Sequence, residues 1–308
     1  MEEKIIDPVP VELIEAELTE ERLLRHTNKA NNLLYVVNAH NAPNVMREIG
    51  RLRELSFRSN GSGVGKSCDI DEFDTMEEPY QQLIVWNPDS KEIIGGYRFI
   101  LGENVKFYDN GQPKLAISHL FTFSNRFIKE YLPNTIKLGR SFVAPGYQSS
   151  KGGAKSLFAL DNLWDGLGAL TVKNPQIRYF LGKMSMGPNE ISNKEQRNMI
   201  LNFLKDRYGD KEGLISVNSP VSVDPKYKIV ATDFKEFNAE LKKNGYRLPP
   251  LFNSYLGLSG TAIYFGTTVN DTFNTELEDS GLMVFLSDIF EEKRERHIDS
   301  YLKEINQR

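Results

Sequence analysis

The spacing of apolar residues near the start of the chain predicts a strand followed by an amphipathic helix. Residues 33–37, LLYVV, are β-branched and aromatic, which is typical of a strand. From Pro43 onward, Val45, Ile49 and Leu52 recur at helical spacing, so a helix with one apolar face is expected there. The glycine-rich sequence NGSGVG that follows is expected to end this helix in a loop.

The rest of the pattern predicts a run of strands and then strands that alternate with helices. The first 30 residues are expected to form a polar helix. Further strands are predicted at residues 81–87, 92–100, 118–124, 135–143, 177–186, 261–269 and 281–290. Helices are predicted at residues 156–172, 193–209 and 231–245, with a charged helix at the C-terminus. This order of elements indicates a mixed sheet of the α+β (α/β) class.

Composition places the chain with soluble globular proteins, since 40% of its residues are hydrophobic and 26% are charged. The 308 residues show no internal repeat, low-complexity tract or linker-like stretch, and a single domain over residues 1–308 is expected. The net charge of −4 argues against a dedicated nucleic-acid binder. Cys68 stands alone, which excludes an intramolecular disulfide framework and a multi-cysteine zinc site.

The N-terminal sequence lacks a basic segment leading into an apolar one, so no secretory signal is expected and the predicted location is cytoplasmic. Residues 248–270 carry no charge, but proline, glycine, serine and asparagine interrupt their apolar positions. A spanning helix needs about 20 predominantly apolar residues. The segment is therefore interpreted as a buried turn and strand.

Several common chemistries are not visible in the sequence. NGSGVGKS at residues 60–67 imitates a phosphate-binding loop, but Asn60 stands where glycine is required and a helix precedes it in place of a strand. DIDEFD resembles the start of a calcium loop but has Phe73 and Asp74 where an oxygen ligand and glycine belong. Cys68 lies beside acidic residues that would raise its pKa. The histidines lack metal-ligand spacing, no metal site is expected, and no Gly-x-Ser-x-Gly elbow is present.

Three clusters of charged residues remain as candidates. Each cluster taken singly is more typical of solvated surface than of a functional site. Their order along the chain is the informative feature. The clusters are Arg53 with Phe57 one helical turn later, the acidic turn Asp71-Glu72-Phe73-Asp74, and Arg98 in one strand with Lys137-Leu138-Gly139-Arg140-Ser141 in another.

A fourth segment, Val143 to Ala154, predicts a binding site for an anion. A strand that stops at Val-Ala-Pro, a small polar and glycine-rich loop, and a helix start together present unpaired backbone N–H groups. Such a site suits a pyrophosphate or a phosphopantetheine, and an ordinary glycine-rich turn is the alternative. The candidate contact residues are Val143, Gln148, Ser149, Lys151, Gly152, Gly153 and Ala154.

This segment resembles the acyl-carrier-binding loop of the Gcn5-related N-acetyltransferase (GNAT) superfamily, with one extra residue between Gln148 and Gly152. The four motifs in this order resemble a narrower branch, the N-acyl amino acid synthases that make ornithine and glycine lipids, with acyl-homoserine-lactone synthases as distant relatives. The similarity covers about residues 33–187 as the core, and residues 188–308 are expected to complete or extend the sheet. The ending also resembles glycine-lipid synthases, which are often labelled hemolysins.

The resemblance implies an N-acyltransferase that moves an acyl chain, often 3-hydroxylated, from acyl carrier protein to the α-amino group of an amino acid. Glycine is the preferred acceptor and ornithine the second, and the product is an aminolipid precursor. No permanently bound cofactor is implied, because acyl–acyl carrier protein (with its phosphopantetheine) or acyl-CoA acts as co-substrate. The implied partners are acyl carrier protein, the amino acid and, peripherally, the inner membrane, with no nucleic acid.

The resemblance also implies roles for the candidate residues. Arg53, Arg98 and Arg140 match the branch's arginines and are expected to hold the acceptor carboxylate or the carrier phosphate. Asp71 and Asp74 match its paired acids, which orient the ammonium or pass its proton through water. Phe57 is expected to wall the pocket, and Glu72 and Ser141 are further substrate-binding candidates.

Lys137 departs from the branch's pattern, because relatives usually carry glutamate at this position, three residues before the arginine. If that glutamate is the base, this chain uses Asp71, Asp74, a water chain or Lys137 itself, the last only where desolvation lowers the lysine pKa. Two other readings stay open. One is an acetyl-CoA-dependent N-acetyltransferase acting on a small amine, and the other is a catalytically silent carrier-binding or membrane-associated protein.

Overall fold

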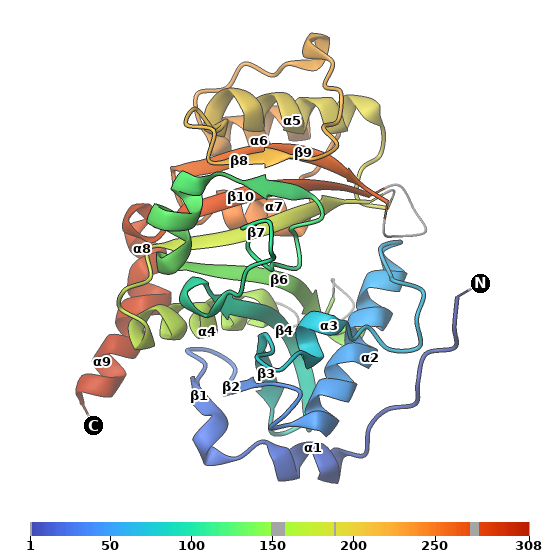
Figure 1. Cartoon of the computed structure of the whole chain (residues 1–308), viewed down its shortest axis with the longest axis vertical. Helices are drawn as coiled ribbons and strands as arrows, with labels where there is room; N and C mark the ends of the chain where they lie inside the picture. The colour runs from blue at the N-terminus through green and yellow to red at the C-terminus, as the bar shows by residue number, and fades with distance from the viewer. Residues whose placement is uncertain (1, 149–157, 188, 272–276, 308) are drawn as a thin grey trace.

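The computed structural model describes residues 2–148, 158–187, 189–271 and 277–307 (Figure 1). A large mixed sheet runs through the molecule, and in the described part its pairs are antiparallel except for one parallel pair, β6 with β7. In spatial order its strands are β1 (Leu23–His26), β2 (Leu33–Val37), β3 (Gln81–Asn87), β4 (Glu92–Leu101), β6 (Thr135–Val143), β7 (Tyr179–Met186), β10 (Leu277–Phe285) and β9 (Ala262–Asn270). The expected mixed α/β class is confirmed.

Helices cover the large sheet, and a small second sheet, which shares no strand with it, packs against one of its faces. The helices are α1 (Val11–Glu17), α2 (Pro43–Ser59), α3 (Glu72–Thr75), α4 (Ala159–Lys173), α5 (Lys194–Tyr208), α6 (Phe234–Lys243), α7 (Pro250–Leu256), α8 (Glu291–Arg294) and α9 (Ser300–Asn306). The second sheet pairs β5 (Phe121–Phe123) with β8 (Ile215–Val217).

The two faces of the large sheet carry different coverings. On one face, α4 packs so closely that a Cβ on Gly166 would lie 2.7 Å from a methyl group of Leu83. The side chain of Gln82, which directly precedes Leu83 in β3, points to the opposite face, because side chains alternate along a strand. On that face Arg53 of α2 donates a hydrogen bond to Gln82. Farther along that same face, a Cβ on Gly281 of β10 would lie 2.9 Å from the ring of Phe121, so the β5–β8 pair covers this part.

β6 carries the two irregularities that shape the centre of the sheet. Its ladder with β4 shifts register between Gly96 and Arg98, so that Arg140 and Ser141 together oppose Tyr97. This is a β-bulge, and Arg140 takes a positive φ of 48° within it. On the other side, the parallel pairing with β7 ends at Lys137 opposite Leu181, although both strands continue. We call this point the strand parting.

Some of the expected elements are wrong. The first 30 residues form only the short helix α1 and then β1, because Leu23–His26 finds a partner in β2, a pairing that local sequence does not reveal. The strand predicted at 118–124 shortens to Phe121–Phe123 and joins the small sheet rather than the large one. The segment 248–270 contains the helix α7 before β9. None of the described helices is long and apolar enough to cross a membrane.

Candidate functional site

An arginine–aspartate cluster lies where α2 and α3 meet β3 and β4. Arg53 is wholly buried and places Nη1 at 3.1 Å from Oδ2 of Asp74, and Nη2 donates to the side chain of Gln82. Gln82 in turn donates to Oδ1 of Asp74 at 3.0 Å. Arg98 completes the ring, with Nη1 at 3.1 Å from Oδ2 of Asp74. The sequence brings these groups together because α2, α3 and two neighbouring strands each supply one side chain.

Asp71 connects this cluster to the bulge in β6. Its Oδ1 accepts from Nη1 of Arg98 at 2.6 Å, and its Oδ2 lies 3.5 Å from Nη2 of Arg140. Arg140 also places Nε at 3.0 Å from Oδ2 of Asp69. Asp71 and Asp74 additionally cap α3, since Asp71 accepts from the backbone N–H of Phe73 and Asp74 from that of Asp71. The acidic motif therefore fixes its own turn while it pairs the arginines.

Asp74 and Arg98 keep their charges over the physiological pH range. Burial alone would raise the pKa of Asp74, but the guanidinium groups of Arg53 and Arg98 outweigh it and hold that pKa well below 3.8. Burial likewise opposes the charge of Arg98, yet Asp74 and Asp71 raise its pKa above the usual value. Groups fixed in this way supply an electrostatic framework and make poor proton acceptors.

Lys137 differs from the ion-paired residues of the arginine–aspartate cluster. Its side chain is 2% exposed, and among the described residues it has neither a hydrogen-bond nor an ion-pair partner. Burial lowers its pKa well below 10.5, and the positive charges of Arg98, Lys183 and Arg140 lower it further. Lys137 is therefore strongly biased toward the neutral amine, which is the form that accepts a proton.

Tyr80 forms a wall beside Lys137, and no motif in the sequence pointed to it. The Nζ of Lys137 lies 5.5 Å from the centre of the Tyr80 ring, and the guanidinium carbon of Arg98 lies 5.2 Å from it. Phe73 packs edge-on against this ring. The Tyr80 hydroxyl accepts a hydrogen bond from the backbone N–H of Ala116, which ties the wall to the segment before β5.

A second charged cluster lies beyond the strand parting, and sequence reasoning missed it. Asp279 of β10 is wholly buried and accepts from Lys183 at 2.7 Å, from Ser185 at 2.5 Å and from Asn270 at 2.5 Å. His119 lies near this group, and partial desolvation and the charge of Lys183 lower its pKa. One signal was present in the sequence, because Lys183 and Ser185 alternate with apolar residues along β7 and so share one face.

The other predicted residues are less closely grouped. Phe57 is half-buried against the main core, and Ser141 lies in the bulge. Glu72 is largely exposed on α3, with its carboxylate 3.8 Å from Lys114, so the structure does not bring it into the cluster. Its role in binding stays a prediction.

The start of the predicted anion loop is anchored. The carbonyl oxygen of Val143 accepts from Ser56 of α2 at 2.9 Å and from the side chain of Gln148 at 2.6 Å. Ser149, Lys151, Gly152, Gly153 and Ala154 lie outside the described residues, and their proposed contacts stay predictions.

The rejection of the phosphate-binding loop at residues 60–67 has a physical basis in the structure. The backbone N–H groups of Val64 and Gly65 donate to the buried carboxylate of Glu54 at 3.1 and 2.9 Å, so they already hold an anion of the chain itself. Burial, with Asp69 second, raises the pKa of Cys68 to about 11, as expected for a poor nucleophile.

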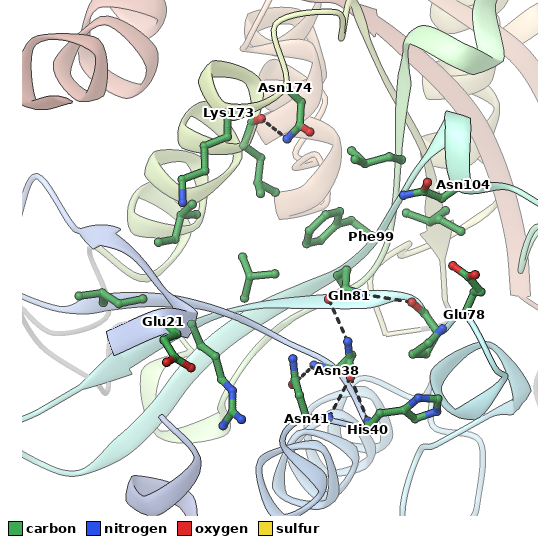
Figure 2. Close-up of a pocket in the computed structure, with 18 of the residues that line it drawn as sticks. Glu21, Asn38, His40, Asn41, Glu78, Gln81, Phe99, Asn104, Lys173 and Asn174 are labelled. Atoms are coloured by element: carbon green, nitrogen blue, oxygen red, sulfur yellow. Dashed lines mark hydrogen bonds between the residues drawn. The ribbon is translucent and has the colours of Figure 1, made fainter. Parts of the chain in front are cut away.

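A cavity of about 630 Å³ lies elsewhere (Figure 2). It opens beside the C-terminal end of α4, where Lys173 and Asn174 face Phe99, and Asn38 donates to Gln81 across its floor. Its lining includes none of the arginine–aspartate cluster and neither lysine of the strand parting. Because the cavity is not lined by these candidate residues, we assign it no part in the site.

Comparison with known proteins adds independent evidence. Residues 52–156 match the family model described as an acetyltransferase (GNAT) domain. Over 98% of its length, the chain is 52% identical to a glycine N(alpha)-acyltransferase of Bacteroides thetaiotaomicron, covering 91% of that protein. It is 49% identical to a second protein of that name from Phocaeicola vulgatus, over 98% of this chain and 94% of the other.

A solved CoA-dependent acyl-homoserine lactone synthase resembles the structure more weakly. The two chains are 10% identical, with a TM-score of 0.34 over 85% of each. A likeness of that size supports no argument.

Proposed function

The chain belongs to the glycine N(alpha)-acyltransferase family of GNAT enzymes and is an N-acyltransferase, and from this premise we propose that its acceptor is the α-amino group of glycine. We further propose that the donor is an acyl chain carried as a thioester on acyl carrier protein, and that the product enters aminolipid synthesis. Relatives with this name, at about half identity over nearly the whole chain, carry the proposal for glycine.

The proposed reaction needs no enzyme nucleophile. The neutral amine nitrogen of glycine attacks the thioester carbon, the carbon–sulfur bond breaks, and the carrier leaves as a thiolate that then takes up a proton. The amine loses one proton in exchange, so the enzyme must supply a base and hold both substrates in line. A half-buried and weakly acidic Cys68 is consistent with direct attack.

Lys137 is the proposed base, and its burial without a partner is the single observation that carries this assignment. Asp74 is a poor alternative, because two guanidinium groups hold its pKa low. Both carboxylate oxygens of Asp71 face arginines, Arg98 and Arg140. The arginine–aspartate cluster then serves to fix the position of Lys137 and to keep its ammonium form unfavourable.

The test is an acyl-transfer assay on the purified protein with glycine and each of three donors: acetyl-CoA, palmitoyl-CoA and 3-hydroxypalmitoyl–acyl carrier protein. We expect N-acylglycine with the long-chain donors, detected by mass spectrometry. Lys137→Met should lower kcat by about 10²- to 10⁴-fold, the range for loss of a general base. Lys129→Met, at an exposed position, is the control and should leave the rate unchanged.

The pH profile tests the base separately. The neutral amine of Lys137 is the form that accepts a proton. The value of kcat/KM should therefore rise with pH as Lys137 loses its own proton, and it should reach a plateau well below pH 10.5. Transfer only from acetyl-CoA would replace the proposal with a short-chain acetyltransferase. Full activity in Lys137→Met would remove Lys137 as the base while leaving the acceptor assignment intact.

A further inference from the structure

Asp279 is an unusual residue to bury in the middle of a sheet. It has no exposed surface, and three donors on the two neighbouring strands hold it: Lys183 and Ser185 of β7 and Asn270 of β9. A buried ion pair generally adds little to stability compared with apolar side chains of similar volume. A cluster of this kind that lies in a candidate site is therefore better explained by a role in function.

The cation of this pair is turned toward the reaction centre. Lys183 is 19% exposed at its side chain, whereas Asp279 is 0% exposed, so the pair offers its positive end to a ligand. Lys183 follows Leu181, the residue opposite Lys137, by two positions on the same face of β7. The strands β6 and β7 are still paired at Lys137 and Leu181, so Lys183 lies only two positions along β7 from the residue directly beside Lys137. The charge of Lys183 acts on Lys137 across this gap, and one small molecule can therefore meet both lysines.

The other partly exposed cation, Arg140, is less suited to receive an anion. Its guanidinium group contacts Asp69 and Asp71, and the Asp71 side chain is itself 28% exposed. A carboxylate arriving there would meet the oxygens of Asp71 as well as the guanidinium. At Lys183 the acidic partner Asp279 is covered, so an arriving carboxylate would meet the ammonium rather than the oxygens of Asp279. His119, whose pKa is lowered, adds no opposing negative charge.

We propose that Lys183, held in place by Asp279, binds the carboxylate of the acceptor and so makes the enzyme select an α-amino acid over a simple amine. This inference rests on the proposed function and names the acceptor-recognition residue of that site. In glycine the amine and the carboxylate are separated by one carbon, so a carboxylate on Lys183 leaves the amine directed at Lys137. The bound anion also favours protonation of Lys137, so the acceptor strengthens the base that deprotonates it.

The experiment compares glycine with glycinamide, which has the same amine but no carboxylate, using one long-chain donor. In Lys183→Gln we expect KM for glycine to rise by about 10- to 100-fold, the effect of losing one charge-assisted hydrogen bond, with kcat changed much less. The ratio of kcat/KM for glycine to that for glycinamide should fall by the same factor, because any change in the pKa of Lys137 affects both acceptors equally. Lys183→Arg should retain most of the preference for glycine.

The control is Arg197→Gln. Arg197 pairs at 2.6 Å with Glu278, the neighbour of Asp279 on β10 whose side chain points to the opposite face of the sheet. This variant breaks an ion pair as short as the Lys183–Asp279 pair, so it should leave the preference for glycine intact. If Lys183→Gln folds poorly, the double variant Lys183→Met, Asp279→Leu removes both charges and should show the same loss of preference.

The outcomes separate the two proposals. Wild-type protein that acylates no glycine from any donor overturns the proposed function. Wild-type activity with an unaltered preference for glycine in the Lys183 variants overturns this inference alone. An equal loss for glycine and glycinamide also overturns it, since Lys183 would then support the fold or the donor rather than recognise the carboxylate.

Discussion

Among the regions in which the described chain buries charge, two lie far apart, and only one of these two belongs to the proposed site. The first is the arginine–aspartate cluster of Arg53, Asp74 and Arg98. The second, which we call the C-terminal clamp, centres on Asp165 of α4. Asp165 is wholly buried and accepts from Nδ1 of His297 at 2.8 Å and from the backbone and side chain of Asn28 at 2.9 and 2.7 Å.

The clamp joins three segments that are far apart in sequence: α4, the turn after β1 and the π-helical turn Glu295–Asp299 before α9 (Figure 1). Its close fit extends to the backbone, because a Cβ on Gly168 of α4 would lie 2.0 Å from the carbonyl oxygen of His297. Asp165 is matched by donors on both sides. The arginine–aspartate cluster is also paired, although the Nε atoms of Arg53 and Arg98 have no hydrogen-bond partner in the described part of the chain, and it adjoins Lys137, a buried amine without a described partner.

The comparison teaches that burial of charge alone does not identify a site. A matched buried network holds segments together wherever it occurs. A buried ionisable group that has no partner beside such a network lowers the stability of the folded state. Such a group marks the position at which a substrate or a proton completes the arrangement. The predictions below test this difference.

The largest expected effect is for Arg53→Met. Removal of Arg53 leaves the Oε1 atom of Gln82 without its donor and takes away one of the two guanidinium charges paired with Asp74 in a dry interior, which typically costs about 3–5 kcal/mol. The free energy of unfolding, measured by urea denaturation, should fall by that amount, and acyl transfer should be lost. A loss below about 1 kcal/mol would show that the cluster is more hydrated than its burial indicates.

The sequence predicted this cluster better than it predicted the rest of the site. Arg53, Asp71, Asp74, Arg98 and Arg140 fall in motifs whose order is informative, and the structure brings them within contact of one another. The resemblance to the N-acyl amino acid synthases also indicated Lys137 as the unusual position, because relatives usually carry glutamate there. What spacing cannot give is whether a lysine has a partner, since that depends on side chains from other strands.

Lys183 and Asp279 show why the remainder was missed. They are 96 positions apart in sequence, and they meet only because β7 and β10 pair in a register that places Gly281 opposite Lys183 and Asp279 opposite Ser185. Nothing local distinguishes Asp279 from a surface aspartate. The strand β1 was missed for the same reason, because its partner β2 and not its own sequence makes Leu23–His26 extended.

The second prediction is that Lys137→Met makes the protein more stable. The pKa of Lys137 is lower in the folded state than the ordinary value of 10.5, so below pH 10.5 the unfolded state binds more protons and the native lysine is destabilising. Methionine fills similar volume without a charge, and the free energy of unfolding at pH 7 should rise by about 1–3 kcal/mol.

The dependence on pH distinguishes this explanation from simple repacking. In the wild-type protein, stability should increase as pH rises toward 10.5, because the unfolded state loses its extra proton there. In Lys137→Met that slope should disappear. A variant that is less stable than wild type at pH 7 would mean that Lys137 is matched by a partner, and the contrast with the clamp would no longer hold.

The smallest expected effect is for Asp165→Asn in the clamp. Asparagine keeps the shape and one acceptor oxygen, so the Asn28 contacts are weakened in part and the loss of stability should be about 1–2 kcal/mol. Acyl transfer by the folded variant should stay within about twofold of wild type, because no clamp residue reaches the strand parting and a change in folding free energy alone does not alter the rate of molecules that remain folded. Assays well below the unfolding midpoint keep the two effects apart.

If Asp165→Asn lost transfer as completely as Lys137→Met while it stayed folded, then α4 would pass changes in the clamp to the site. A matched network would then affect the chemistry as strongly as an unmatched charge, and the distinction between the two regions would fail.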